Sequence, residues 1–364
     1  MKTVVFTIVT RNRLHLARVL MQSVAAAFPA AERHALVIDP ADGFFDPAAE
    51  PFAVTLGPAL GLPEFSSYAF VNDALSLCCL LKPAYAQYLL ENTAADTLIY
   101  ADSDMRCHAP PEGLAAVLQH APVVFTPHAL APLGPTAPRR DSDLMRSGAF
   151  NAGFFALRRG ESATVFLRWW LDVMCGQRQL DAVFAHDQQW LSLASVYFPW
   201  IHALRDPGYN VAYWNIHERP LGRQPDGRLT AGGRPLAFFH YSFFDPATPD
   251  LLAHRPPIVV PTHDAILHEL LCDYVQSLAQ AGAATCQAWP YGYGQFTDGT
   301  PVTAEQRRYY LERVWADSAH AGNPFEPGFA SRHHRGLRSV YALHQPLPRA
   351  LRRLRHWMRK ISPV

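Results

Sequence analysis

The sequence predicts an α/β protein whose mixed, mostly parallel sheet is flanked by helices and followed by a C-terminal extension. Strand-like runs and helical segments alternate along the first half of the chain, which is typical of parallel strands joined by helical crossovers. A chain of 364 residues, 49% of them hydrophobic and 17% charged, can bury a substantial core. Loops that follow parallel strands gather at one edge of the sheet, so functional residues are expected there.

Each predicted element follows from a local pattern. Residues 4–9 form a β-rich run, and 14–28 place apolar side chains at near-helical spacing. A second short strand is predicted over 35–38, followed by a long helix over 68–92 and a strand over 97–102. Farther along, the sequence predicts strands over 149–157, 210–214 and 236–241, and helices over 162–174 and from residue 187 onward, with the sheet ending near residue 245.

The chain is expected to divide into a core (1–245), an extension packed on that core (246–327) and a basic tail (328–364). After Glu326 the sequence has nine Arg or Lys and no Asp or Glu, so the tail differs in charge from the rest of a chain whose net charge is +1. Within the tail, 349–361 is predicted to form a basic amphipathic helix that contacts an anionic membrane surface. A solvated helix and a helix packed on a domain are the alternatives.

Several classes of protein are disfavoured. The N-terminal apolar run is too short for most secretory signals, and the longest uncharged run, 114–138, is interrupted by four prolines, so no membrane-spanning helix is expected. The six cysteines show no C-x-x-C pairing, which favours reduced thiols, a cytoplasmic location and no structural zinc. No DNA- or RNA-binding motif accompanies the basic tail, so a nucleic acid partner is not expected.

Two carboxylates stand directly after the apolar run over 97–101, at Asp102 and Asp104. Alternate residues of an extended chain face the same way, so both side chains can reach one cation. Mg²⁺ and Mn²⁺ prefer oxygen ligands, and Mg²⁺ is usually held by one or two carboxylates together with substrate phosphates. The sequence therefore predicts a divalent metal site here.

The same spacing recurs at Asp141 and Asp143, but this second copy follows a Pro-Arg-Arg segment rather than a strand. We interpret it as a solvated loop.

Other polar residues are also expected near the predicted metal site. Most of them follow a predicted strand, and Lys82 lies on the helix that precedes the site in the sequence. Asn12 has the alternative of capping a helix, and Lys82 that of covering a helix surface. The residues predicted to contact a bound cofactor at this edge are Thr10, Arg11, Asn12, Asp39, Lys82 and Ser103.

Four short motifs follow one another along 1–245. They are a D-x-D after a strand, an N-x-G strand, a D-Q pair that opens a helix, and a late histidine, here Asp102-Ser103-Asp104, Asn151-Ala152-Gly153, Asp187-Gln188 and His240. In this order they resemble the GT-A fold of nucleotide-sugar-dependent glycosyltransferases, a Rossmann-like domain whose D-x-D motif binds a metal diphosphate. The order is most similar to family 8-like retaining enzymes. Segments 205–215 and 238–242 also resemble a bacterial glycosyltransferase group often linked to surface polysaccharide assembly.

One part of the family 8 pattern is missing. The usual H-x-x-G-x-x-K-P-W signature is absent, since His240 is followed by Tyr-Ser-Phe-Phe. The lysine contact to the donor phosphate is therefore not implied, and retention of configuration is favoured only slightly.

The resemblance implies a metal-dependent hexosyltransferase that uses a nucleotide sugar, most simply a UDP-sugar, and a saccharide or other hydroxyl acceptor, lipid-linked if the tail binds membrane. Mn²⁺ or Mg²⁺ held by Asp102, Asp104 and His240 would neutralise the charge that develops on the departing nucleoside diphosphate. Asp187 and Gln188 would stabilise an oxocarbenium-like transition state. Helix capping is the alternative for Asp187, and a hydrogen-bonded core position is the alternative for His240.

Sugar or acceptor contacts are expected from the N-x-G strand and from the loop after 210–214. Gly153 has the alternative of marking a strand bulge, and Trp214 that of packing in the core. The residues in this group are Asn151, Ala152, Gly153, Trp214, Asn215 and His217.

Two other functions compete with this one. A sugar-1-phosphate nucleotidyltransferase would need a glycine-rich phosphate loop after the first strand, and residues 10–13 contain no glycine. A non-catalytic carbohydrate-binding protein on the same fold would bind metal and nucleotide without turnover.

Overall fold

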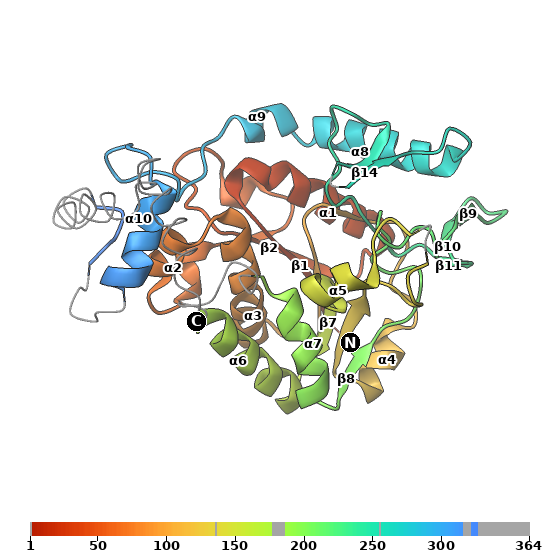
Figure 1. Ribbon diagram of the computed structural model, residues 1–364, viewed down its shortest axis with the longest axis horizontal. Coiled ribbons are helices and arrows are strands. Elements are labelled where there is room, and N and C mark those ends of the chain that lie inside the picture. The colour runs from red at the N-terminus through yellow and green to blue at the C-terminus, as the bar shows by residue number, and fades with distance from the viewer. Residues whose placement is uncertain (1, 135–136, 177–185, 255, 316–321, 327–364) are drawn as a thin grey trace, which may run out of the picture. The chain divides into compact units, whose positions relative to one another are not determined.

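The computed structural model of the protein describes residues 2–134, 137–176, 186–254, 256–315 and 322–326 (Figure 1). The amphipathic helix predicted over 349–361, and the membrane contact predicted for it, lie outside the described residues. None of the described helices is both long and apolar enough to cross a bilayer.

The described strands are β1 (Thr3–Val9), β2 (Glu32–Val37), β3 (Ala53–Leu56), β4 (Thr97–Ala101), β5 (Met105–Cys107), β6 (Val123–Pro127), β7 (Phe150–Arg158), β8 (Ile201–Ala203), β9 (Leu221–Arg223), β10 (Leu229–Ala231), β11 (Arg234–Pro235), β12 (Phe238–His240), β13 (Leu251–His254) and β14 (Pro257–Val259). The described α-helices are α1 (Leu14–Ala27), α2 (Phe65–Val71), α3 (Ala74–Asn92), α4 (Leu114–His120), α5 (Asp141–Ser147), α6 (Glu161–Cys175), α7 (Gln188–Tyr197), α8 (Ala265–Gln280), α9 (Ala283–Gln287) and α10 (Ala304–Tyr309). Shorter helical turns are η1 (Arg11–Arg13), η2 (Pro47–Ala49), η3 (Gly57–Leu60) and the π-helical η5 (Tyr310–Val314).

The main sheet has seven strands in the order β3-β2-β1-β4-β7-β6-β8. Strands β3, β2, β1 and β4 pair in parallel, as do β6 and β8, whereas β7 is antiparallel to both of its neighbours. This topology confirms the predicted mixed, mostly parallel sheet. Because β1, β2 and β4 run in one direction, the residues that follow them meet at the same edge.

Alternating side chains of the central strands build a core on each face of the sheet. On one face, the rings of Phe6, Tyr100 and Phe155 lie 4.9–5.9 Å apart, centroid to centroid. Helices α3 and α6 cover this face through Tyr85 and Trp170. The opposite face packs against α1 in a cluster that includes Val5, Ile99, Phe154, Leu20 and Val24.

The helix predicted over 68–92 is two helices, α2 and α3. The break has a local cause, because the Asp73 carboxylate accepts a hydrogen bond from the Ser76 amide at 2.8 Å and so caps a new helix.

The prediction of a strand over 210–214 is wrong. Val211 alone forms a bridge, to Phe239 of β12, and the chain then turns. The turn is held by the Asn215 carboxamide, whose oxygen accepts a hydrogen bond from the Ala212 amide at 2.9 Å.

The second Asp-Ser-Asp triplet lies in the first turn of α5 and not in the predicted loop. The Asp143 carboxylate accepts a hydrogen bond from the Arg140 amide at 2.9 Å, and the Asp141 carboxylate accepts one from the Leu133 amide at 3.2 Å. Both carboxylates are therefore engaged by backbone at the start of a helix.

The described part of the chain forms two compact units, one within residues 2–65 and 72–292 and the other within 66–71 and 293–326. In the second unit, the Arg307 guanidinium donates hydrogen bonds to the carbonyls of Phe70 and Tyr293, and Phe70 contacts the ring of Tyr310. The predicted division into a core, an extension and a tail stays a prediction.

Candidate functional site

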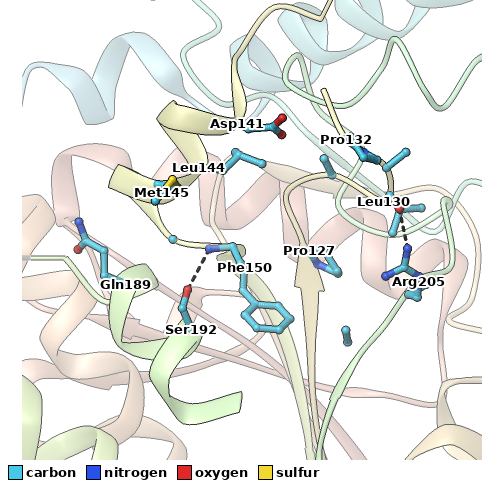
Figure 2. Close-up of a pocket in the computed structure, with 15 residues that line it drawn as sticks. Pro127, Leu130, Pro132, Asp141, Leu144, Met145, Phe150, Gln189, Ser192 and Arg205 are labelled. Atoms are coloured by element: carbon cyan, nitrogen blue, oxygen red, sulfur yellow. Dashed lines mark hydrogen bonds between the residues drawn. The ribbon is translucent and has the colours of Figure 1, made fainter. Parts of the chain in front are cut away.

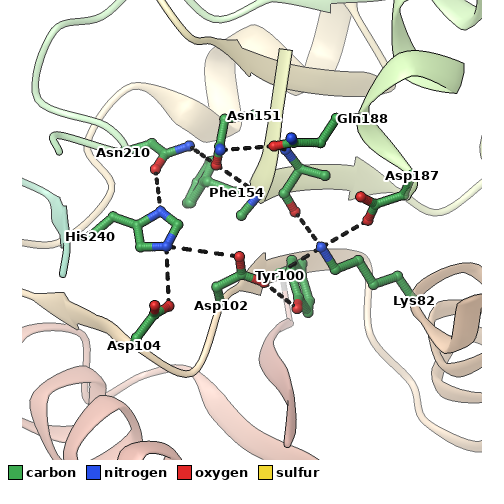
Figure 3. Close-up of polar contacts among 12 residues, drawn as sticks. Lys82, Tyr100, Asp102, Asp104, Asn151, Phe154, Asp187, Gln188, Asn210 and His240 are labelled. Carbon is green, nitrogen blue, oxygen red and sulfur yellow. Dashed lines mark hydrogen bonds and ion pairs between the residues drawn. The ribbon is translucent and has the colours of Figure 1, made fainter. Parts of the chain in front are cut away.

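Asp102, Asp104 and His240 converge at the carboxyl edge of the main sheet (Figure 3). One ligand atom from each lies within 4.8 Å of the others. The His240 Nε2 atom is 3.1 Å from Asp104 Oδ1 and 3.9 Å from Asp102 Oδ2. His240 is buried, and the two carboxylates are each about one-third exposed, so the cluster opens to solvent on its carboxylate side.

A long-range strand pairing brings the histidine to the aspartates. Strands β5 and β12 pair antiparallel with His240 opposite Met105, directly after Asp104. The Tyr241 amide donates a hydrogen bond to the Asp104 carbonyl at 2.9 Å, which extends this pairing. The position of His240 therefore depends on the register of two segments that are distant in the sequence.

The electrostatics of the cluster follow from its mixed charges. Burial lowers the pKa of His240, but the carboxylates of Asp104 and Asp102 outweigh burial and raise it. Burial raises the pKa of Asp104, but His240 outweighs burial and lowers it. Each partner thus stabilises the charged form of the other.

The residues fit a divalent cation. Two carboxylates and one imidazole are ligands found around first-row divalent metals, and three protein ligands leave coordination positions for phosphate oxygens. Gly153 forms a wall of the same space, where a Cβ atom would lie 2.7 Å from His240 Cε1 and 2.9 Å from Asp102 Oδ2. The space between the Gly153 backbone and the metal-binding side chains is therefore too small for an added Cβ atom.

Asp102 is held from its other side. Its Oδ1 atom accepts a hydrogen bond from the Tyr100 hydroxyl at 2.5 Å and lies 3.5 Å from Lys82 Nζ. Its backbone amide donates to the Gly153 carbonyl at 2.8 Å. These contacts leave Oδ2 facing His240.

Lys82 contacts both Asp187, one of the two predicted catalytic residues, and Asp102 of the metal cluster. Its Nζ atom lies 2.8 Å from Asp187 Oδ2 and donates a hydrogen bond to the Ala152 carbonyl at 3.0 Å. Although burial lowers the pKa of Lys82, the carboxylates of Asp102 and Asp187 raise it above its usual range. The interpretation of Lys82 as a surface-covering residue is therefore wrong, and so is capping by Asp187, whose side chain makes no cap hydrogen bond.

The side-chain amides of Gln188, Asn151 and Asn210 form a hydrogen-bonded row, the amide row. The Gln188 Oε1 atom accepts from Asn151 Nδ2 at 2.9 Å and from the Ala152 amide at 3.2 Å. Asn151 Oδ1 accepts from Asn210 Nδ2 at 2.9 Å, and Asn210 Oδ1 pairs with His240 Nδ1 at 3.0 Å. The row therefore links Gln188 to the metal cluster.

Two members of this neighbourhood were not predicted. Asn210 was assigned to a strand, and His128 was not singled out. Burial, with Arg139 nearby, lowers the pKa of His128 to about 3, so its neutral Nε2 can accept from Asn151 Nδ2 at 3.3 Å. The sequence shows each of them as a single polar residue among apolar neighbours. This pattern indicates a buried position but does not say which group the side chain contacts.

The residues predicted to meet the nucleotide lie at the same edge, but their polar groups are used within the protein. The Arg11 guanidinium pairs with Asp42 at 2.7 Å and donates to the Pro290 carbonyl at 2.7 Å. Asp39 accepts from the amides of Arg11 (2.7 Å) and Gly292 (2.6 Å). We conclude that Arg11 and Asp39 hold together the loops that follow β1 and β2 and the segment around Pro290.

Thr10, Asn12 and Ser103 have smaller roles in the structure. The Thr10 hydroxyl donates to Asn12 Oδ1 at 2.6 Å, and Asn12 lies inside η1, so the helix-capping interpretation of Asn12 is wrong. Ser103 is half-buried in the turn between the two aspartates.

The loop after Asn210 divides into a buried and an exposed part. Trp214 is buried between His128 and His240, at ring-centroid distances of 5.6 and 5.2 Å, as the core-packing alternative predicts. Asn215 is fully buried and donates to the Asn210 carbonyl at 3.0 Å. His217 is exposed, so of the three it alone offers a side chain to solvent.

A mostly apolar pocket of about 710 Å³ is lined by residues of α5, of α7 and of the segment that follows β6 (Figure 2). Polar contacts hold its walls: the Arg205 guanidinium donates to the Leu130 carbonyl at 2.5 Å, and the Ala149 amide donates to the Ser192 hydroxyl at 2.9 Å. The lining residues nearest in sequence to the amide row are Phe150 and Gln189.

Gly153→Ala is expected to weaken Mn²⁺ binding by about 10–100-fold, the effect usual for disturbing the support of a metal ligand. The added Cβ would lie within 3.0 Å of three site atoms, so the ligands must move. Isothermal titration with Mn²⁺ measures the change. Gly134→Ala is the matched control, since a Cβ there meets nothing within 4 Å; equal affinities in the two variants would contradict the prediction.

Fold and site together define an α/β protein with a candidate metal centre where its parallel strands end. No protein family model matches the chain. It is 26% identical, over 172 residues, to the uncharacterized protein YfnD of Bacillus subtilis (strain 168); this match covers 46% of the chain and 53% of YfnD, so the chain spans about half the length of that curated relative.

Among solved structures, the chain is similar to three glycosyltransferases. The galactosyltransferase LgtC, in complex with donor and acceptor sugar analogs, is 15% identical with a TM-score of 0.44, over 76% of this chain and 95% of that one. GlyE of Streptococcus pneumoniae TIGR4 is 13% identical (TM-score 0.41; 81% and 67% covered), and a glycosyltransferase involved in glycosylation of the major capsid of PBCV-1 is 9% identical (0.39; 77% and 100%). Values this low leave the function to be inferred from the chain's own residues.

Proposed function

We propose that this protein is a metal-dependent glycosyltransferase that moves a hexosyl group from a nucleotide sugar, most simply a UDP-sugar, to a hydroxyl of a saccharide or other acceptor. One observation carries the proposal: a cluster of Asp102, Asp104 and His240, with its carboxylates partly exposed, stands at the carboxyl edge of a mostly parallel sheet. Ligands of open α/β sheets bind at this edge.

A bound Mn²⁺ or Mg²⁺ would supply Lewis-acid stabilisation of the leaving diphosphate. The chain's own residues prepare that step. Tyr100 and Lys82 hold Asp102 so that its second oxygen faces the cluster. Lys82 also pairs with Asp187 at 2.8 Å and so fixes the position from which Asp187 would stabilise positive charge on the sugar.

Gln188 takes part in this proposal as an orienting residue. Its carbonyl oxygen is occupied by Asn151 and Ala152, so it holds the N-x-G strand against α7. The sugar would then contact the backbone of this strand. The apolar pocket beside Gln189 is the place we propose for the acceptor, because it adjoins the same strand.

Titration calorimetry with UDP and with GDP, each with and without Mn²⁺, tests the proposal. Mn²⁺-dependent binding of one nucleotide is expected, and it selects the base for a screen of donor sugars. Release of pyrophosphate from a nucleoside triphosphate and a sugar phosphate would instead identify a nucleotidyltransferase. Binding without turnover would identify a non-catalytic protein, and no binding of either nucleotide would count against the proposal.

The finer parts of the proposal concern stereochemistry and setting. Retention of configuration is slightly favoured, and the anomeric coupling in a proton NMR spectrum of the first product would decide it. A cytoplasmic location, a role in surface polysaccharide assembly and a membrane contact by 349–361 complete the proposal, and cell fractionation with and without that segment addresses the last of these.

A further inference from the structure

Asn210 occupies an unusual position for a residue outside the metal cluster. It is 1% exposed and has a φ of +54°, a left-handed conformation that asparagine tolerates better than most residues. Its side-chain amide and its carbonyl are both hydrogen-bonded, to Thr126, Asn151 and His240 and to Asn215. A non-glycine residue in this backbone conformation, held by so many hydrogen bonds, is typical of a functional site.

The direction of the Asn210 amide follows from the backbone. The Gly153 amide can only donate, and it donates to one atom of the Asn151 carboxamide at 2.9 Å, so that atom is the oxygen. Asn210 lies 2.9 Å from the same oxygen and must present its NH₂ group there. The same NH₂ group donates to the Thr126 hydroxyl at 2.8 Å.

The Asn210 oxygen must therefore face His240. It lies 3.0 Å from Nδ1, and because an amide oxygen can only accept, Nδ1 carries a proton. In the neutral imidazole only one ring nitrogen is protonated, so the lone pair is on Nε2, the atom that faces Asp102 and Asp104. This is the tautomer that a cation between these three side chains requires.

We propose that Asn210 is the positioning residue of the metal centre: it selects the His240 tautomer that binds the cation and is itself oriented, through Asn151, by the backbone of the N-x-G strand. The inference rests on the proposed function insofar as that function requires a cation in this cluster. Outer hydrogen-bond partners of metal-binding histidines fix the ring and its tautomer in the same way.

Asn210→Gly removes the side chain without straining the backbone, because glycine adopts a positive φ without strain. We expect this variant to bind Mn²⁺ about 10–100-fold more weakly than the wild type, measured on the protein alone by titration calorimetry and by the free-ion signal in electron paramagnetic resonance. Glu64→Gly is the matched control, since it makes the same change at an exposed residue with a φ of +57°. Its affinity for Mn²⁺ is expected to equal that of the wild type.

Asn210→Asp tests whether Asn210 acts through its hydrogen bond to His240. A carboxylate oxygen still accepts from His240 Nδ1, so Mn²⁺ affinity is expected to stay near that of the wild type, although the contact with Asn151 becomes one between two oxygens. Nitrogen-15 NMR of the imidazoles, with the His240 signal assigned by its loss in His240→Gln, gives the second readout. Because the carboxylates of Asp104 and Asp102 raise the pKa of His240, the spectra are recorded at a pH high enough for its imidazole to be neutral. There we expect a protonated Nδ1 in the wild type and in Asn210→Asp, and a mixture of tautomers in Asn210→Gly.

The outcomes separate this inference from the proposed function. Wild-type protein that binds no Mn²⁺ would overturn both. Wild-type binding that is retained in Asn210→Gly, or an equal loss in Asn210→Gly and Asn210→Asp, would overturn the role of Asn210 and leave the proposed function standing.

Discussion

Asp102→Asn combined with Asp104→Asn is expected to abolish Mn²⁺-dependent binding of the nucleotide that the wild type prefers. The loss should exceed about 100-fold, because changes to the outer partners of a metal ligand already cost about 10–100-fold. Both charged ligands of the cluster disappear, and His240 alone cannot hold a hard cation against water. Titration calorimetry with UDP or GDP in the presence of Mn²⁺ measures the effect.

The chain contains its own control for this experiment. Asp141→Asn combined with Asp143→Asn makes the same chemical change in the second Asp-Ser-Asp triplet. Here the carboxylates accept hydrogen bonds at the start of α5, so a stability loss of about 1 kcal/mol and no change in nucleotide binding are expected. If this pair lowered Mn²⁺-dependent binding as strongly as the first pair, the assignment of the metal site would be wrong.

Lys82→Met is expected to destabilise the protein by about 3–5 kcal/mol, the usual cost of breaking a buried ion pair by removing one partner. Lys82 is 4% and Asp187 2% exposed, and their charged atoms are 2.8 Å apart. Without Lys82 the Asp187 carboxylate is left buried beside another acidic group, Asp102. Equilibrium unfolding in urea, followed by tryptophan fluorescence, measures the difference in free energy of unfolding.

Two variants show whether the loss comes from the unpaired charge. Lys2→Met removes a lysine whose side chain is 44% exposed and pairs with Glu32 at 2.9 Å, so about 0–1 kcal/mol is expected. Lys82→Met combined with Asp187→Asn removes the buried negative charge as well and should recover part of the stability. A double variant less stable than Lys82→Met would show that the ion pair is not the source of the effect.

Much of the fold could be predicted because it depends on local patterns. The β-rich run over 4–9 and the apolar run before Asp102 became β1 and β4, and their parallel pairing confirms the α/β class. The errors also have local causes that compete with periodicity. Asp73 caps a helix inside an apolar helical segment, and Asn215 holds a turn inside a β-rich one.

The interpretations of single polar residues were less secure, because a residue type does not name its partner. The sequence leaves Lys82 with either a phosphate contact or a surface position, but the structure places it in a buried ion pair with Asp187. Arg11 was expected to meet a nucleotide, yet its guanidinium pairs with Asp42. In both cases the opposite charge comes from a distant part of the chain.

The class of the fold and the place of the two aspartates could be predicted from the sequence, because alternation within a strand and the end of an apolar run are properties of neighbouring residues. The approach of His240 to these aspartates, with Asn210 and Asn151 hydrogen-bonded behind the histidine, is visible only in the folded protein. These contacts depend on the pairing of β5 with β12 and on the break in register between β6 and β7 near Gly153. Strand register between distant segments is set by the packing of the whole core, and no local pattern specifies it.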